Sequence, residues 1–242
     1  MESTNPAFRS KAIEELSRRS VGAAAMTVSG TATKTLVLLL ATAFSAGLVW
    51  QADQAVWGSA MLVGSIGGLI LALATSFKPT WAPITAPLYA VVEGLALGAI
   101  SGIYNARFVG LPMMAVAATL VTAVLLFAAY RARLITVTDR MRAVAGMALM
   151  GLLATYLLQF VLGFFHISMP FINGGGVLGI GFSLLSTGLA AFFLLLDMDR
   201  VEQMVRSGLP KSMEWYGAFG FLVTLIWLYM EMLKLLSKLN RR

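Results

Sequence analysis

The chain has no cysteine and a single histidine, His166, among its 242 residues. The absence of cysteine excludes disulfides, thiol nucleophiles and thiolate metal sites. A single imidazole is also too few for a histidine-rich zinc site, and it makes a conventional catalytic triad improbable. We expect His166, which follows two phenylalanines, to contact lipid headgroups rather than a metal.

Charged residues are scarce as well, at 12%, whereas hydrophobic residues make up 59% of the chain. Ordinary globular chains contain about 25% charged and about 45–50% apolar residues. The apolar residues here come in continuous blocks and not at the three-to-four spacing of a half-exposed helix. A soluble chain of this length needs more polar surface to cover its core. The chain is therefore predicted to be an integral membrane protein with the lipid bilayer as its main partner.

The formal net charge of +7 does not indicate a nucleic-acid partner. Lysine and arginine occur in short gaps between apolar blocks, without a basic stripe interleaved with aromatic residues. In these gaps they act as topology signals and as contacts for anionic headgroups.

Seven apolar blocks have the length of about 20 residues that a hydrocarbon core about 30 Å thick requires. We predict an all-α bundle of seven transmembrane helices joined by short connections that contain Gly and Pro. The predicted spans are Ala32–Trp50, Val56–Phe77, Pro83–Tyr104, Pro112–Tyr130, Met141–Phe165, Gly175–Leu196 and Trp215–Leu236.

The prediction divides the chain into a leader at 1–31, a helix bundle at 32–238 and a basic tail at 239–242. Within the leader, residues 7–20 fit a solvated segment better than an interfacial anchor. With the N-terminus in the cytoplasm, thirteen Lys and Arg residues lie on that side and five on the other, which favours this orientation. The basic tail then lies outside, unless the last apolar segment re-enters without crossing.

Acidic residues within an apolar span are costly and are therefore the first functional candidates. Glu93 lies about ten residues into the third predicted span, near the middle of the membrane. Gly94, Gly98 and Gly102 follow it at four-residue spacing, which lets another helix approach closely. Glu93 is either a functional carboxyl group or a protonated side chain that a neighbouring helix satisfies.

Further acids lie around the last two spans. Asp197 and Asp199 close the sixth span and point about 200° apart, so only one of them can face the bundle interior. An acidic helix end in the headgroups is the alternative for both. Glu214 precedes the seventh span, where it suits the helix dipole, and Glu231 lies within a turn of Lys234, where an ion pair is expected. Candidate counter-charges at the cytoplasmic side are Lys78, Arg131, Arg133, Arg140, Arg142 and Arg200.

The chain resembles the bacterial branch of the Bax inhibitor-1 family over essentially its whole length. The matching segments are Asn5-Pro6-Ala7-Phe8, MTVSGTATKT at 26–35, EGLALGAISGIY at 93–104, GIGFSLL at 179–185, LDMDRVEQ at 196–203 and MEWYGAFGFLVTLIWLYMEMLKLL at 213–236. The order and spacing of these segments carry the resemblance, since none is specific alone.

The resemblance implies six helices around a central seventh and, in bacterial members, a pH-sensitive calcium leak gated by two aspartates. The first aspartate corresponds to Asp197. Aligning the family's basic residue of the last span with Lys234 puts Thr224 where the second aspartate is expected, and Trp227 where the family has an asparagine. Glu231 lies about 10 Å and Glu214 about 15 Å from that position along a helix, so neither replaces the missing acid.

The leading hypothesis is therefore a pH-sensitive cation leak or exchanger, for Ca²⁺ or H⁺, controlled by Asp197 and Glu93 with Ca²⁺ passing near Asp197. Its oxygen-only ligands suit hard cations, and no cofactor is expected. The alternative is a regulatory protein that binds a membrane protease or a stress-response partner. An enzyme is not expected, because paired acids and an activated nucleophile are both lacking. The resemblance places the chain in the bacterial cytoplasmic membrane.

Overall fold

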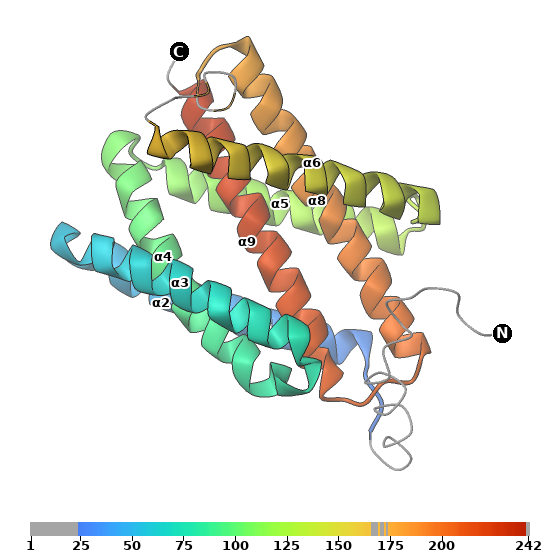
Figure 1. Ribbon diagram of the computed structural model, residues 1–242. Helices are drawn as coiled ribbons and strands as arrows, with labels where there is room; N and C mark the ends of the chain where they lie inside the picture. The colour runs from blue at the N-terminus through green and yellow to red at the C-terminus, as the bar shows by residue number, and fades with distance from the viewer. Residues whose placement is uncertain (1–23, 166–168, 170–171, 173, 241–242) are drawn as a thin grey trace. The chain divides into compact units, whose positions relative to one another are not determined.

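The computed structural model describes residues 24–165, 169, 172 and 174–240. Seven long α-helices occur in this part of the chain (Figure 1). All are long and apolar enough to cross a membrane. The elements are α2 (Val28–Gln51), α3 (Gln54–Phe77), the short 3-10 helix η2 (Pro79–Trp81), α4 (Ala82–Arg107), α5 (Leu111–Arg131), α6 (Asp139–Phe164), α8 (Val177–Arg206) and α9 (Met213–Leu239). The prediction of an all-α protein with seven spans is confirmed.

Local sequence signals set the ends of these helices. The side chains of Thr27, Asp53 and Thr138 accept hydrogen bonds from backbone N–H groups in the first turns of α2, α3 and α6. Gly110 precedes α5 with a φ of 79°, a left-handed conformation that a residue with a Cβ rarely adopts. The short connections between the apolar blocks of the sequence are therefore also the connections between the helices.

The helices are mostly longer than the predicted spans, and the difference is largest in α8. The sixth span was predicted to end at Leu196, but α8 continues to Arg206. Asp197 and Asp199 therefore lie inside a helix, which corrects the interpretation of both as a helix end. The connection predicted at 197–214 shrinks accordingly, because α9 begins at Met213 and contains Glu214. The predictions for residues 7–20, His166 and the last two arginines concern positions outside the described residues.

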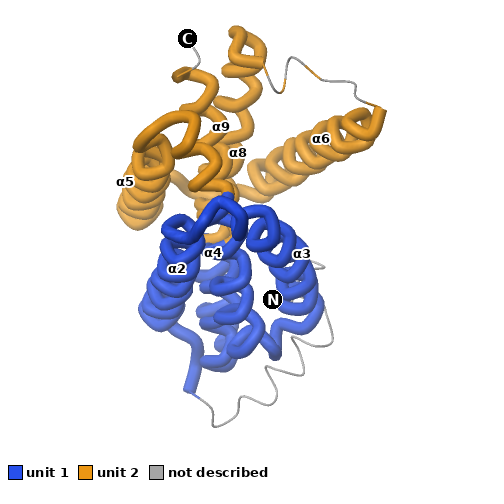
Figure 2. Tube along the Cα trace, turned by 90° about the vertical axis from the view of Figure 1, so that its left-hand side faces the viewer, with its two compact units in different colours: residues 1–99, 199–222 blue, residues 100–198, 223–242 orange. Residues whose placement is uncertain are grey.

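The chain divides into two compact units (Figure 2). Unit 1 comprises Met1–Ala99 and Asp199–Leu222, and unit 2 comprises Ile100–Met198 and Val223–Arg242. Helices α4, α8 and α9 contribute residues to both units, so the polar sites of each unit are described separately below. The 18-residue apolar windows with the largest buried shares lie in Pro79–Arg107, at 56%, and Met213–Leu239, at 44%. Extensive burial is thus a property of two helices and not of the last one alone.

Small residues bring the helices of unit 1 together. A Cβ built on Gly64 of α3 would lie 2.5 Å from the backbone nitrogen of Ala96 in α4. One built on Gly98 of α4 would lie 2.3 Å from the carbonyl oxygen of Ala46 in α2. Helix α4 therefore packs against both α2 and α3, and its glycine-rich face is used as the four-residue spacing predicted.

The segment before α2 is anchored to the connection between α8 and α9 within unit 1. Met26 N–H donates to the carbonyl of Leu209 at 2.8 Å, and Lys211 N–H donates to the carbonyl of Ala24 at 2.9 Å. The Met26 side chain is buried in a cluster with Leu209 and Met213. Residues 24–27, which were assigned to the leader, therefore contact the connection between α8 and α9 within unit 1.

Candidate functional site

Asp197 forms a polar contact between α8 and α9 in unit 2. Its side chain is 6% exposed, and its Oδ2 accepts a hydrogen bond of 2.5 Å from the hydroxyl of Thr224. Trp227, one turn further along α9, packs on Phe193 of α8 with ring centroids 5.6 Å apart. The residue at the position expected for a second aspartate therefore contacts Asp197, but it offers a hydroxyl group and not a carboxyl group.

Asp199 has a different environment. It is part of unit 1, and its Oδ2 accepts a hydrogen bond of 2.7 Å from Nε2 of Gln203, one turn along the same helix. A rotation of about 200° separates positions two residues apart on a helix. Asp199 is thus engaged along its own helix, while Asp197 bonds across to α9.

The six candidate counter-charges are spread over several elements. Lys78 lies over the ring of Trp81, with Nζ 4.2 Å from the centroid. Arg142 pairs with Asp139 at 3.0 Å in the first turn of α6. The remaining four side chains are exposed: Arg131, Arg133, Arg140 and Arg200. The contact described for Asp197 is the Thr224 hydroxyl, and its ion pairing with these cations stays a prediction.

Glu231 is the centre of a second buried polar group in unit 2. Its side chain is 1% exposed, and Lys234 Nζ lies 3.0 Å from Oε1, the ion pair that the spacing predicted. The hydroxyl of Tyr156 in α6 donates to the same oxygen at 3.0 Å, and Ser186 in α8 donates to Oε2 at 2.8 Å. Both carboxylate oxygens are therefore satisfied, as a buried charge requires.

Glu214 occupies an equivalent buried position in unit 1. Its Oε2 pairs with Lys34 Nζ of α2, and its Oε1 accepts 3.0 Å hydrogen bonds from the backbone N–H and the hydroxyl of Thr27. Gly30 leaves the space that this carboxylate fills, because a Cβ there would lie 2.2 Å from Oε1. Glu214 lies in the first turn of α9, where the sequence placed it for the helix dipole, and the structure adds that it is a buried anchor for the start of α2. The MTVSGTATKT segment supplies all three of these partner residues.

Glu93 lies on α4 in unit 1, and its carboxylate rests against α3. A Cβ built on Gly68 would lie 1.9 Å from Oε2, so the glycine provides the space for the acid. Among the described residues, no hydrogen-bond partner is found for this carboxylate. Its nearest titratable neighbour on the same helix is Tyr89, one turn earlier. The geometry thus places Glu93 at a helix contact and leaves both sequence interpretations of it open.

The contacts of Gly68 and Gly98 differ in a way that can be tested. We expect Gly68→Ala to cost about 1 kcal/mol, because the flexible end of Glu93 can move aside. Gly98→Ala should cost about 3 kcal/mol, because the new methyl group meets the backbone of Ala46. Adding Glu93→Ala should restore the stability of the Gly68→Ala variant. It should leave the stability of the Gly98→Ala variant unchanged. Thermal unfolding in detergent measures both, and equal effects of Glu93→Ala on the two variants would contradict the described contact.

Most partners of the buried acids could not be found in the sequence. Lys34 and Thr27 are separated from Glu214 by 180 or more residues, and Tyr156 and Ser186 from Glu231 by 75 and 45. No local spacing connects such positions. Among the described residues, no three His, Asp or Glu side chains are close enough to hold a metal ion.

Seven membrane-spanning helices with buried acids on the last two define the chain as a multi-pass membrane protein. The family model described as Bax inhibitor 1 like matches residues 5–241. The chain therefore belongs to the Bax inhibitor 1 like family. No curated protein and no solved structure matches it.

Proposed function

We propose that this protein is a pH-sensitive cation leak or exchanger, with Ca²⁺ as the expected ion, and that Asp197 controls its opening. The hydrogen bond between Asp197 and Thr224 carries the proposal. It joins two membrane-spanning helices through a carboxylate that is almost fully buried. An ionisable group buried in a span is costly, and such groups usually belong to an ion or proton pathway.

The chemistry of this contact suggests how protons act on it. A hydroxyl donates a stronger, charge-assisted hydrogen bond to an ionised carboxylate than to a neutral carboxyl group. Protonation of Asp197 therefore weakens the bond between α8 and α9. We expect the contact to loosen as the pH falls and cation flux to rise.

Asp197 is proposed as a gate and not as a resident calcium site. Ca²⁺ takes about 6–8 oxygen ligands, whereas one carboxylate and one hydroxyl supply at most three. The ion is cargo that passes the contact when it opens. The same chemistry makes no use of a nucleophile or a cofactor, and we propose no enzymatic activity.

Flux into proteoliposomes of the purified protein tests the proposal, with Ca²⁺, K⁺ and H⁺ indicators used in parallel across pH. Asp197→Asn keeps the size of the side chain and removes its charge, so it should flatten the pH dependence of flux. Asp199→Asn is the matched control two residues away, and it should leave the pH profile as in the parent protein. We expect a single broad step in the parent profile, because one acid titrates at this contact.

Two results would count against the gate. Equal profiles for the parent protein and Asp197→Asn would show that protonation of this residue does not govern flux. A protein that conducts none of the three ions at any pH would contradict the leak itself. A reproducible membrane partner for such a silent protein would favour the regulatory alternative.

A further inference from the structure

Glu93 is an acidic side chain near the middle of a membrane span in unit 1. It lies 11 residues after Ala82 and 14 before Arg107, the two ends of α4. At 1.5 Å per residue these distances are about 17 and 21 Å, so the carboxyl group lies deep in a hydrocarbon core about 30 Å thick. Ionisable groups at such a depth are costly and usually functional. The proposed gate at Asp197 makes no use of this one.

The two helices that pack on α4 beside Glu93 bring no counter-charge to it. The carboxylate fills the space left by Gly68 of α3, and α3 has no ionisable side chain along its whole length. Helix α2 packs on Gly94, and its only ionisable side chain is Lys34. Lys34 is already paired with Glu214. A carboxylate at position 93 would therefore have no cation from α2 or α3.

Helices α9 and α4 do not supply a nearby cation either. In unit 1, α9 contacts α4 through the rings of Phe219 and Tyr89, whose centroids lie 5.1 Å apart. The ionisable residues of α9 in this unit are Tyr216 and the paired Glu214. On α4 itself, Tyr89 lies one turn before the acid, and the only basic residue is Arg107 at the end of the helix.

The carboxylate oxygens of Glu93 reach the surface of unit 1. Among the described residues, no hydrogen-bond partner is found for them, and every fully buried side-chain oxygen or nitrogen has a partner. Neither oxygen of Glu93 is therefore fully buried, in agreement with its partly exposed side chain. The exposed side chains next to Gly68 and Glu93 include those of Leu69 and Val91, which are apolar. At this depth in the span, the carboxyl group thus opens toward hydrocarbon.

These surroundings favour the neutral form of the acid. An ionised carboxylate here has neither a counter-ion nor a hydrogen bond in an apolar medium, and a group in that position binds a proton instead. The ligand is a proton and not a metal ion, because Ca²⁺ takes about 6–8 oxygen ligands and one carboxyl group supplies at most two. Among the described residues, no three acids or histidines lie close enough together to hold a metal ion.

We propose that Glu93 is a proton-binding site that opens onto the hydrocarbon beside α3 and α4. The side chain holds its proton at neutral pH, with the neutral carboxyl group seated in the space left by Gly68, and it releases the proton when the pH rises. The site belongs to unit 1 and requires no ion flux, so it does not depend on the proposed leak.

Labelling by dicyclohexylcarbodiimide, a hydrophobic reagent, tests the site in the full chain reconstituted in liposomes. A carboxylic acid adds to one C=N bond of the reagent: its proton goes to a nitrogen and its oxygen bonds to the central carbon. The ionised acid has no proton to give. We expect the label on peptide 79–107, in which Glu93 is the only acid. Once the group ionises, labelling should fall about tenfold per pH unit, because the neutral fraction does so.

Two results of this labelling would overturn the proposal. An unlabelled peptide 79–107 at about pH 6 would show that the acid is ionised there or closed to the hydrocarbon. Labelling that stays constant from about pH 6 to about pH 10 would show that Glu93 does not release its proton. Mass spectrometry of the digested protein measures both.

Asp139 is the control for an acid in water, since its side chain is 96% exposed at the start of α6. A water-soluble carbodiimide with a small amine should modify Asp139 and leave Glu93 unmodified, because this reagent does not enter the hydrocarbon. The hydrophobic reagent should show the opposite preference. Equal modification of the two acids by the water-soluble reagent would show that Glu93 faces water, and would contradict access from the hydrocarbon.

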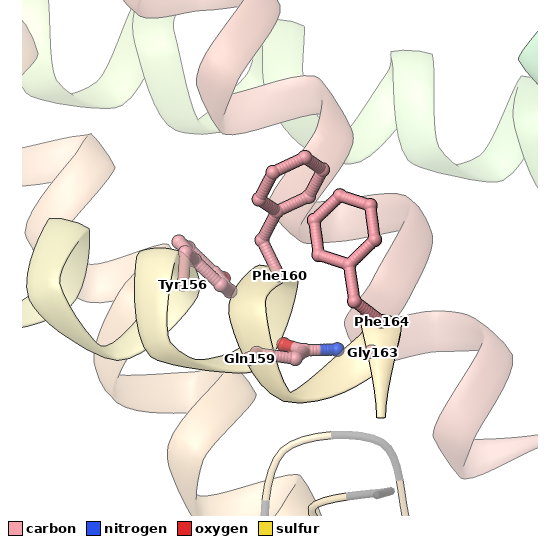
Figure 3. A pocket seen from close by; sticks show the side chains of 5 residues that line it. All are labelled: Tyr156, Gln159, Phe160, Gly163 and Phe164. Atoms are coloured by element: carbon pink, nitrogen blue, oxygen red, sulfur yellow. The ribbon is translucent and has the colours of Figure 1, made fainter. Parts of the chain in front are cut away.

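Glu231 in unit 2 is the control for a span acid that has partners. Its side chain is 1% exposed, and both of its oxygens accept hydrogen bonds. Its partner Tyr156 lines a pocket of about 450 Å³ on α6 together with Gln159, Phe160, Gly163 and Phe164 (Figure 3). None of these five lining residues is an acid, so the reagent should leave Glu231 unlabelled even where it enters the pocket. Labelling of Glu231 as fast as that of Glu93 would contradict the assigned basis of the reactivity.

Glu93→Gln keeps the size and polarity of the side chain and removes the proton-binding group. It should lose all label from peptide 79–107 and keep the melting temperature of the parent protein, because the neutral amide suits the same position. Asp139→Asn is the matched control, and labelling of Glu93 should be unchanged in it. Label that persists on peptide 79–107 of Glu93→Gln would place the reaction on another side chain and rule out the site.

Discussion

Lys34→Met should destabilise the protein by about 3 kcal/mol, because it removes the cation from a buried ion pair. The Glu214 side chain is 1% exposed and that of Lys34 is 17% exposed. Without Lys34, the Glu214 carboxylate keeps its two hydrogen bonds from Thr27 but loses its counter-charge. The loss releases the start of α2 from α9 within unit 1. Thermal unfolding in a mild detergent, followed by tryptophan fluorescence, measures the effect.

The matched control removes both charges together. Lys34→Met combined with Glu214→Gln leaves no uncompensated ion, and the amide oxygen of glutamine still accepts hydrogen bonds from Thr27. The double variant should therefore regain most of the stability lost in Lys34→Met, as is common when a buried pair is replaced as a whole. A double variant less stable than Lys34→Met would contradict the described pair.

Thr224→Asp should change the pH profile of flux from one step to two. The substitution places a second carboxyl group within hydrogen-bond distance of Asp197, where Thr224 Oγ1 now lies 2.5 Å from Oδ2. Two carboxylates at this separation cannot both ionise freely, so they titrate as a coupled pair. The two steps should lie more than about one pH unit apart. Proteoliposome flux measured at closely spaced pH values resolves them.

Thr224→Asn is the control, because it has the size and polarity of aspartate without an ionisable group. It should keep a single step. A profile of Thr224→Asp that matches Thr224→Asn would show that residue 224 does not reach Asp197 in the membrane, and the gate would then need another partner. The pair of variants also shows whether a hydroxyl at this position limits the amplitude of the pH response.

The positions of the helices could be predicted from the sequence because the bilayer imposes a simple length rule. Each span needs about 20 apolar residues whatever lies beside it, and Gly110, Pro79 and the capping residues mark the ends locally. The exception was α8, which continues to Arg206 through a charged segment that hydropathy assigns to a connection. The buried side chains of Val201 and Met204, which pack in one cluster with Leu209 and Met213, stabilise that extension.

The candidate acids could also be found in the sequence, because a charged residue within an apolar segment is easily recognised. The ion pair of Glu231 with Lys234 could be read from their three-residue spacing. Alignment with the family indicated that Thr224 stands where the second aspartate is expected, and the structure places its hydroxyl on Asp197. The sequence alone does not show what each of these acids does.

The sequence by itself therefore determined the class of protein, the number of spans and the acidic residues, because hydropathy and charge are local properties. Only the tertiary structure decided which partner each acid meets. Lys34 and Thr27 reach Glu214, and Tyr156 and Ser186 reach Glu231, through contacts between helices far apart in the chain. Such contacts depend on which faces of the helices pack together, and side-chain packing over the whole unit sets this where hydropathy is nearly uniform.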